Sequence, residues 1–358
     1  MSNPRVEIDL DRLRENGEAV LRACYGREIE PTVVTKVVSA HPEIVRCLRD
    51  LGFRSMADSR LDNLRSLRES VPEVKLELLR LPMLSRVREV VDVADVSLNS
   101  EITTLRALDG AAGELGTRHG VILMIDVGDL REGMWPDEIG SFGEACRHLR
   151  NVDVVGVGTN LACYGGVIPD ADNMARLIKA KSVLEAVMGT RIPMVSGGNS
   201  ANWSMLEAGE MPPEVNNLRL GEVVFLGIES IERRPVEGMH RDVFTLVAEV
   251  IEIREKPSMP LGKTGQDAFG RIPHFEDRGR RLRAIAAVGR ADVSPEGLIP
   301  EDPGIEILGA SSDHLILDVE MAEEPPRTGE ELRFGVRSYE ALLRSFMSDY
   351  VDKWVKGA

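Results

Sequence analysis

Cysteine is scarce and scattered in this sequence. The four cysteines are Cys24, Cys47, Cys146 and Cys163. No two of them form a CxxC pair or combine with histidine at the spacing of a zinc site, so we predict neither a bound metal nor a disulfide framework. This usage fits a reducing cytoplasm.

Long apolar runs and an excess of positive charge are also missing. No run approaches the roughly 18 residues that cross a bilayer, and the N-terminal segment is charged from its fifth residue, so we expect a cytoplasmic protein without a membrane anchor. The chain carries 44 basic and 59 acidic residues, a net charge of −15. Because an acidic surface repels nucleic acid and anionic lipid, a small molecule is the expected partner.

Short apolar runs alternate with amphipathic segments between residues 10 and 237. This alternation is typical of βα units that close a parallel sheet, and about eight units predict an α/β fold with a (β/α)8 barrel of the TIM type. The catalytic groups of such barrels lie at the C-terminal ends of the strands. The runs are PTVVTKVV from Pro31, FRSMADS from Phe53, VKLELLRLP from Val74, VVDVADVSLN from Val90, GVILMIDVG from Gly120, VDVVGVGTNL from Val152, IPMVSGGNS from Ile192 and NLRLGEVVFLG from Asn217.

The sequence pattern changes after Gly238. Stretches such as VFTLVAEVIEI, LRAIAAVG and LILDVEM alternate with period two between turns, which predicts a β domain over residues 238–358. The opening strand within residues 1–9, RVEIDL, also alternates and could pair into this sheet. The last stretch, SYEALLRSFMSDYVDKWV, is amphipathic and predicts a helix.

Lys36 lies inside the apolar run PTVVTKVV. A buried lysine has a lowered pKa, and its neutral amine is a nucleophile suited to a Schiff base. The competing interpretation is a strand-end lysine whose ammonium reaches solvent.

Two later strands carry candidate phosphate ligands. In VSGGNSANW, two glycines precede Asn199 and Ser200, and in NNLRLGEVV Arg219 comes two residues before Gly221. Backbone amides at such strand-to-helix turns, with a serine hydroxyl, can hold a phosphate at the usual position of this fold. By itself, SGGNS is equally consistent with an ordinary turn and helix cap.

Arg131 follows the fifth barrel run, in MIDVGDLREG. An arginine there could clamp a substrate carboxylate or contact a cofactor oxygen. The alternative is a surface ion pair with Glu132 or Asp129.

These motifs, in this order, resemble the fold-type III pyridoxal-phosphate enzymes and most closely the alanine/ornithine racemase family. The resemblance covers the whole chain. It implies a barrel with the Schiff-base lysine on its first strand, a cofactor of pyridoxal 5'-phosphate, and a C-terminal β domain that completes the active site of a partner subunit in a homodimer.

The resemblance also assigns roles to individual residues. Lys36 matches the cofactor lysine, Arg131 the arginine beside the substrate carboxylate, and Arg219 the arginine that contacts the pyridine nitrogen. Phosphate ligands are implied at Asn199 and Ser200 and at the turn of Gly221 and Glu222. Because arginine keeps its proton, the ring nitrogen stays unprotonated and draws electrons weakly, which favours racemisation over transamination.

Departures from classical alanine racemase point to the ornithine racemase branch. Met124 replaces a lysine, Asn160 replaces the histidine beside the cofactor ring, and VGRADV places Arg290 where the family has the tyrosine that serves as second base. Arginine is a poor base at neutral pH. Three candidates remain for that role, Cys163, Tyr164 and His314, and each could instead be an ordinary packed residue.

The resemblance implies an isomerase that racemises an amino acid by two-base proton transfer, most closely ornithine or another basic amino acid. The distal ammonium of such a substrate would need a carboxylate partner, and the sequence offers four candidates. The alternatives are an alanine or broad-specificity racemase and a non-catalytic pyridoxal-phosphate carrier, although a carrier is normally the barrel alone. Metal-dependent relatives need a histidine together with a cysteine or a second histidine near the end of the chain, where His314 stands alone. The four carboxylates are Asp129, Glu222, Asp267 and Asp313.

Overall fold

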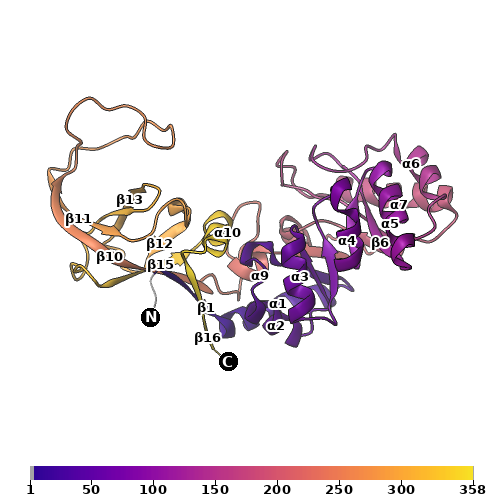
Figure 1. Ribbon diagram of the computed structural model, residues 1–358, viewed down its shortest axis with the longest axis horizontal. Coiled ribbons are helices and arrows are strands. Elements are labelled where there is room, and N and C mark those ends of the chain that lie inside the picture. Colours follow the sequence, from indigo (N-terminus) through magenta and orange to yellow (C-terminus); the bar gives the residue numbers. More distant parts are fainter. Residues whose placement is uncertain (1–3, 358) are drawn as a thin grey trace. The chain divides into compact units, whose positions relative to one another are not determined.

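The computed structural model describes residues 4–357 and forms two compact units (Figure 1). One unit runs from Arg12 to His240. The other combines the segment up to Asp11 with the chain from Arg241 onward. The first three residues of the predicted opening strand, and Ala358 of the predicted β domain, lie outside the described residues.

Eight parallel strands close the first unit into a barrel, which confirms the predicted fold. The final strand pairs back onto the first, so that Thr32 lies opposite Arg219. The strands are β2 (Glu30–Val34), β3 (Ser55–Asp58), β4 (Lys75–Leu78), β5 (Val96–Asn99), β6 (His119–Met124), β7 (Val152–Gly158), β8 (Met194–Ser196) and β9 (Asn217–Leu220).

Helices connect the barrel strands, and their apolar faces are buried. In α2, for example, Ile44, Val45 and Leu48 are fully buried and recur at helical spacing. The helices are α1 (Leu10–Tyr25), α2 (Pro42–Asp50), α3 (Leu61–Ser70), α4 (Val87–Val93), α5 (Ile102–Leu115), α6 (Ile139–Cys146), α7 (Ala171–Met188), α8 (Trp203–Ala208) and α9 (Glu222–Leu226), with short 3-10 turns η1 (Thr35–Val38), η2 (Leu84–Arg86) and η3 (Ser200–Asn202).

The barrel corrects three predicted strand boundaries. The run from Val90 begins in α4 and becomes a strand only at Val96, and the run from Asn217 ends as a strand at Leu220, after which EVVFL is helix α9. Four consecutive residues of α9 are buried, so its sequence has no periodicity that distinguishes helix from strand. The first strand ends at Val34, and Lys36 therefore lies in the η1 turn after the strand and not inside it.

The second unit is built on an antiparallel sheet in the order β12-β15-β10-β11-β14-β13. Strand β1 pairs antiparallel with β10 and parallel with β16. The predicted C-terminal helix covers only the first part of its stretch, because α10 (Tyr339–Met347) gives way to strand β16 (Asp352–Lys356). The other elements are β1 (Arg5–Asp9), β10 (Phe244–Pro257), β11 (Arg280–Ala286), η4 (Pro295–Gly297), β12 (Leu298–Pro300), β13 (Glu306–Ala310), β14 (Leu315–Asp318) and β15 (Glu331–Val336).

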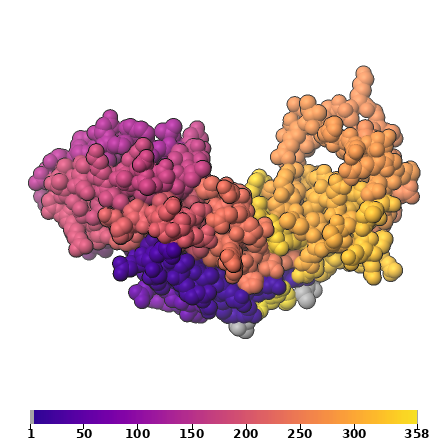
Figure 2. Space-filling view, turned by 180° about the vertical axis from the view of Figure 1, so that it is seen from behind, coloured from indigo at the N-terminus to yellow at the C-terminus, as the bar shows by residue number. Residues whose placement is uncertain are grey.

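A buried aromatic contact joins helix α10 to the sheet of this unit. The rings of Phe244 and Phe346 meet edge to face, 5.8 Å between centroids. By contrast, residues 258–279 leave the sheet between β10 and β11 as a long loop that stands out from the rest of its unit (Figure 2). Across residues 4–357, no helix has the length and apolar character needed to cross a membrane.

Candidate active site

Lys36 lies directly after strand β2, at the C-terminal end of the barrel. Its neighbours Thr35 and Val37 are buried, and the Lys36 side chain is itself partly buried. Burial lowers the pKa of Lys36, and the positive charge of Arg131 lowers it further, while Cys163 and Asp58 oppose the shift. The fraction of neutral, nucleophilic amine near neutral pH is therefore raised.

A serine hydroxyl and two backbone amides meet at the ends of β8 and β9. The Ser200 Oγ accepts hydrogen bonds from the backbone N–H groups of Gly221 at 3.2 Å and Val223 at 3.4 Å. These are groups that bind the oxygens of a phosphate in other proteins. The turn after β9 is also next to the first strand, since a Cβ added at Gly221 would lie 3.5 Å from the Val34 carbonyl oxygen.

The glycines of SGGNS have a structural cause. Gly198 has φ +143°, and a Cβ there would lie 2.1 Å from Oδ1 of Asn202. That Asn202 oxygen accepts the backbone N–H of Asn199, while Oδ1 of Asn199 accepts the N–H of Ala201. The motif is thus the helix cap that the sequence allowed, and the same cap fixes the position of the Ser200 hydroxyl.

Arg219 is buried at the C-terminal end of β9, with 2% of its surface exposed. Its Nη2 donates to the Thr159 carbonyl at 2.6 Å and to Asn160 Oδ1 at 2.7 Å, and its Nη1 donates to Ser196 Oγ. Burial lowers the pKa of Arg219, whereas the carboxylates of Glu77 and Glu132 raise it. Its Nε makes no hydrogen bond with any residue from 4 to 357.

Arg131 is connected to Arg219 through two intervening side chains. It forms an ion pair with Glu132, with 2.5 Å between Nη2 and Oε1, as the alternative interpretation expected. The same Glu132 oxygen accepts a hydrogen bond from Asn160 Nδ2 at 2.6 Å, and Asn160 in turn binds Arg219. Three residues singled out in the sequence, Arg131, Asn160 and Arg219, therefore belong to one network.

Cys163 lies beside this network. Its Sγ accepts a hydrogen bond from Asn199 Nδ2 at 3.3 Å. Burial raises the pKa of the Cys163 thiol, and the positive charges of Arg131 and Lys36 oppose that shift. Tyr164, the next residue, has 76% of its surface exposed.

Two of the four candidate carboxylates for a substrate ammonium already have partners in the barrel unit. Asp129 is 1% exposed and accepts the backbone N–H groups of Cys163, Tyr164 and Val167, so it anchors the loop after β7. Glu222 accepts from Ser230 Oγ at 2.7 Å and from Arg233 Nη1 at 2.8 Å.

The other sequence candidates lie in the second unit. Asp313 and His314 are exposed in the turn between β13 and β14, where Ser311 Oγ accepts the His314 N–H at 3.2 Å. The Asp313 carboxylate makes no hydrogen bond or ion pair with any residue that the structure describes. Asp267 accepts the N–H groups of Phe269 and Arg271, both at 2.9 Å, and so organises its own loop.

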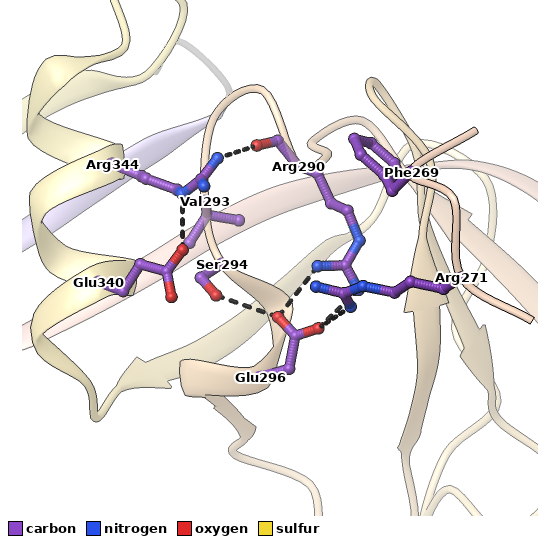
Figure 3. A pocket seen from close by; sticks show the side chains of 8 residues that line it. All are labelled: Phe269, Arg271, Arg290, Val293, Ser294, Glu296, Glu340 and Arg344. Atoms are coloured by element: carbon purple, nitrogen blue, oxygen red, sulfur yellow. Dashed lines mark hydrogen bonds and ion pairs between the residues drawn. The ribbon is translucent and has the colours of Figure 1, made fainter. Parts of the chain in front are cut away.

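Arg290 is held as a cation in the second unit. Figure 3 shows Arg290 and Arg271 both directed at Glu296, with 2.6 Å between Arg290 Nη2 and Glu296 Oε1 and 3.0 Å for Arg271. Arg290 lowers the pKa of Glu296 to about 2. A guanidinium paired in this way is no proton acceptor, as its chemistry predicts. The cavity around it has about 380 Å³ and is lined by Phe269, Arg271, Arg290, Val293, Ser294, Glu296, Glu340 and Arg344.

The sequence analysis missed Glu77, which lies on β4 and is fully buried. It named Glu132 as a possible ion-pair partner of Arg131, but not the hydrogen bond that links Glu132 to Asn160. A charge inside the apolar run VKLELL was a usable signal for Glu77, because buried charges need a partner. Within residues 4–357, no three histidine, cysteine, aspartate or glutamate side chains gather as metal ligands would.

The chain is similar to known racemases along nearly its whole length. The family model for the N-terminal domain of alanine racemase matches residues 8–228. The ornithine racemase of Acetoanaerobium sticklandii is 41% identical over 351 residues, which cover 98% of this chain and 99% of the relative. The lysine racemase of Thermotoga maritima is 40% identical over 353 residues, which cover 99% of this chain and 98% of the relative.

Solved structures share the fold at low sequence identity. The alanine racemase of Streptomyces lavendulae superposes with a TM-score of 0.77 at 18% identity, covering 100% of this chain and 98% of that one. The alanine racemase of Bartonella henselae, solved with covalently bound pyridoxal phosphate, gives 0.75 at 16% identity, covering 99% and 100%. With the sequence relatives, these findings establish that the chain belongs to the alanine racemase family.

Proposed function

We propose that this chain is a pyridoxal-phosphate-dependent racemase of basic amino acids, with ornithine as the first candidate and lysine as the second. The curated relatives, each about 40% identical along the full chain, support this substrate class. The observation that carries the proposal is the position of Lys36 and of the pair of Ser200 and Gly221 at one end of the barrel: Lys36 follows β2, and Gly221, which donates to Ser200, follows the paired strand β9.

The described residues fit the cofactor. The Lys36 amine, with its lowered pKa, suits the aldehyde. The hydroxyl of Ser200 and the amide of Gly221 suit the phosphate, and the unused Nε–H of Arg219 suits the pyridine nitrogen. When bound, pyridoxal phosphate supplies a reactive carbonyl and a ring that draws electron density from the substrate Cα.

The chain itself positions the substrate and moves the proton. Lys36 takes or returns the α-proton on one face once it has released the cofactor. Arg131 orients the substrate carboxylate, and Glu132 holds its guanidinium in place from the side. Arg219 keeps its own proton, so it would donate a hydrogen bond to the ring nitrogen without protonating it, which would favour return of a proton to Cα over loss of the amino group.

We propose Cys163 as the first candidate for the base that acts on the opposite face of the substrate Cα. Its thiol is fixed by Asn199 and lies within the electrostatic influence of Lys36 and Arg131, both of which oppose the rise of its pKa. Tyr164 and His314 remain the alternatives. In C163S, exchange of the α-proton should slow for one enantiomer and persist for the other, whereas equal rates for both would move the role to Tyr164 or His314.

We propose a homodimer in which Asp313 receives the substrate's distal ammonium. The free carboxylate of Asp313 supports this, since Asp129 and Glu222 are occupied. Light scattering tests the dimer. Mixing the inactive variants K36A and D313N should restore part of the ornithine activity if sites are shared between subunits, and no recovery on mixing would contradict sharing.

A screen over the common amino acids tests the whole proposal. Purified holoenzyme incubated with each L-amino acid should form D-ornithine or D-lysine fastest, read by chiral chromatography. K36A should lose the visible absorbance after dialysis and form no borohydride-reducible adduct. Activity confined to small apolar amino acids would support an alanine or broad-specificity racemase instead. Cofactor binding without any exchange of Cα hydrogen for deuterium would support a carrier.

A further inference from the structure

A chain of hydrogen bonds runs through the barrel interior from Arg219 to Glu77. Arg219 Nη1 donates to Ser196 Oγ, and the Ser196 hydroxyl donates to Asn217 Oδ1. Asn217 Nδ2 then donates to Thr32 Oγ1 at 3.0 Å, and the Thr32 hydroxyl donates to Glu77 Oε1 at 3.5 Å. Every link points the same way, so the chain starts at a cation and ends at an anion.

Glu77 is placed where a carboxylate is costly. It is 0% exposed, and its Oε2 finds no hydrogen-bond partner among residues 4–357. Its Oε1 also accepts from Ser55 Oγ at 2.9 Å, and Lys75 Nζ lies 3.9 Å away on the same strand. A buried anion needs a nearby cation. The Lys75 side chain is a distant and partly exposed cation for Glu77, whereas Arg219, which is 2% exposed, is a buried cation.

We propose that Glu77 is a positioning residue for the cofactor ring, acting through Thr32, Asn217 and Ser196 on Arg219. The inference rests on the proposed function. The chain of hydrogen bonds from Arg219 to Glu77, which we call the relay, fixes Nη1 of Arg219 on the core side. Asn160 and the Thr159 carbonyl fix Nη2. With both ends held, the guanidinium keeps its charge and presents its Nε–H to the pyridine nitrogen.

Breaking the relay should change what happens to the substrate as well as how fast it reacts. If Arg219 shifts, water can protonate the ring nitrogen, and the ring becomes a stronger electron sink. More substrate then undergoes transamination, in which an amino acid and pyridoxal phosphate give a 2-oxo acid and pyridoxamine phosphate. If Glu77 had a merely structural role, its replacement would lower stability and rate but leave the ratio of transamination to racemisation unchanged.

Two variants break the relay at different points. Glu77→Gln removes the charge but keeps an acceptor oxygen, and Thr32→Val removes the middle hydroxyl at nearly constant volume. Thr32→Ser restores the hydroxyl. Ser97→Ala is the matched control, because Ser97 is a fully buried barrel serine whose hydroxyl contacts His119 and Asn99 and not the relay.

The measurements use each reconstituted holoenzyme with ornithine and lysine. The 2-oxo acid formed per racemisation event should rise about tenfold in Thr32→Val, the size expected for loss of one hydrogen bond to a charged group. It should also rise in Glu77→Gln, where the bond can form but the charge at its end is gone. Thr32→Ser and Ser97→Ala should stay within about twofold of wild type on the same scale. The resting visible absorbance and the dissociation constant for pyridoxal phosphate are recorded as readouts independent of turnover.

Three results decide the matter. A wild-type partition and spectrum in folded Glu77→Gln and Thr32→Val would overturn the inference, even if both variants melt earlier. If Glu77→Gln does not fold, Thr32→Val with its Thr32→Ser rescue gives the answer alone. If the wild-type chain neither binds pyridoxal phosphate nor racemises any amino acid, the proposed function itself has failed.

Discussion

Replacing Ser200 with alanine should weaken cofactor binding without abolishing catalysis. The Ser200 hydroxyl accepts two backbone N–H bonds, at 3.2 Å and 3.4 Å, and both are longer than the usual 2.9–3.0 Å. These long bonds hold the hydroxyl in place while leaving its own proton available to a phosphate oxygen. Lys36 and Arg219 are untouched by the change, so the chemical step should persist at saturating cofactor.

The size of the loss in cofactor affinity depends on which hydrogen bonds to the phosphate are lost in S200A and which replace them. A hydrogen bond to a charged group contributes about 1.5–3 kcal/mol, which corresponds to roughly 10- to 150-fold in binding. In S200A, the amides of Gly221 and Val223 lose their acceptor and turn to the phosphate, which offsets part of the loss. We therefore expect the dissociation constant for pyridoxal phosphate to rise about tenfold, at the lower end of that range.

The assay is a titration of cofactor-free protein with pyridoxal phosphate, followed by visible absorbance. Ser204→Ala is the matched control, because this serine lies one turn later and its Oγ accepts from Arg234 Nη2 at 3.2 Å. S200A binding as tightly as wild type would refute the assignment of the phosphate to Ser200 and Gly221. An S200A enzyme with the expected weaker binding but no activity at saturating cofactor would show that the hydroxyl has a role in catalysis.

Two further predictions concern folding. G198A should lower the free energy of unfolding by about 1–3 kcal/mol, because Gly198 has φ +143° and its new Cβ would lie 2.1 Å from Asn202 Oδ1. G209A should lower it less, because Gly209 has φ +72° and its new Cβ would have no atom within 4 Å. Equal losses of stability in urea denaturation would contradict this. Burial lowers the pKa of His119 from 6.5 to about 4. As the pH falls, His119 is therefore protonated in the unfolded chain before it is protonated in the folded chain. Stability should drop by about 2 kcal/mol between pH 7 and pH 5, and H119Q should lose that dependence, whereas the same drop in H119Q would assign it to other groups.

The order of the barrel elements was predictable because its strands are buried on both faces. Such strands read as apolar runs, and amphipathic helices separate them. The same property caused the errors. Residues 223–226 are buried in a short helix, and Val90, Val91 and Val93 are buried at the end of another. Neither short run shows the alternation or the helical spacing that would identify it.

The candidate site could be proposed where a residue type carries its chemistry wherever it folds. A lysine inside an apolar run and a serine shortly after two glycines are visible in the sequence alone. Asp129 and Glu132 are not distinguishable in this way, because both are acids in the loop VGDLREG and only folding makes one a loop anchor and the other a partner of Arg131. The opposite-face base could not be chosen for the same reason.

The pairing of β1 between β10 and β16 has a consequence for how the chain is made. β1 precedes the barrel in the chain, but its hydrogen-bonding partners, at 244–247 and 352–356, are synthesised only after the barrel. The barrel, by contrast, is continuous from Arg12 to His240 and can close while the rest is being translated. An unpaired strand edge must therefore wait while the barrel is synthesised, and this interval is when a nascent chain is most exposed to pairing with the wrong neighbour.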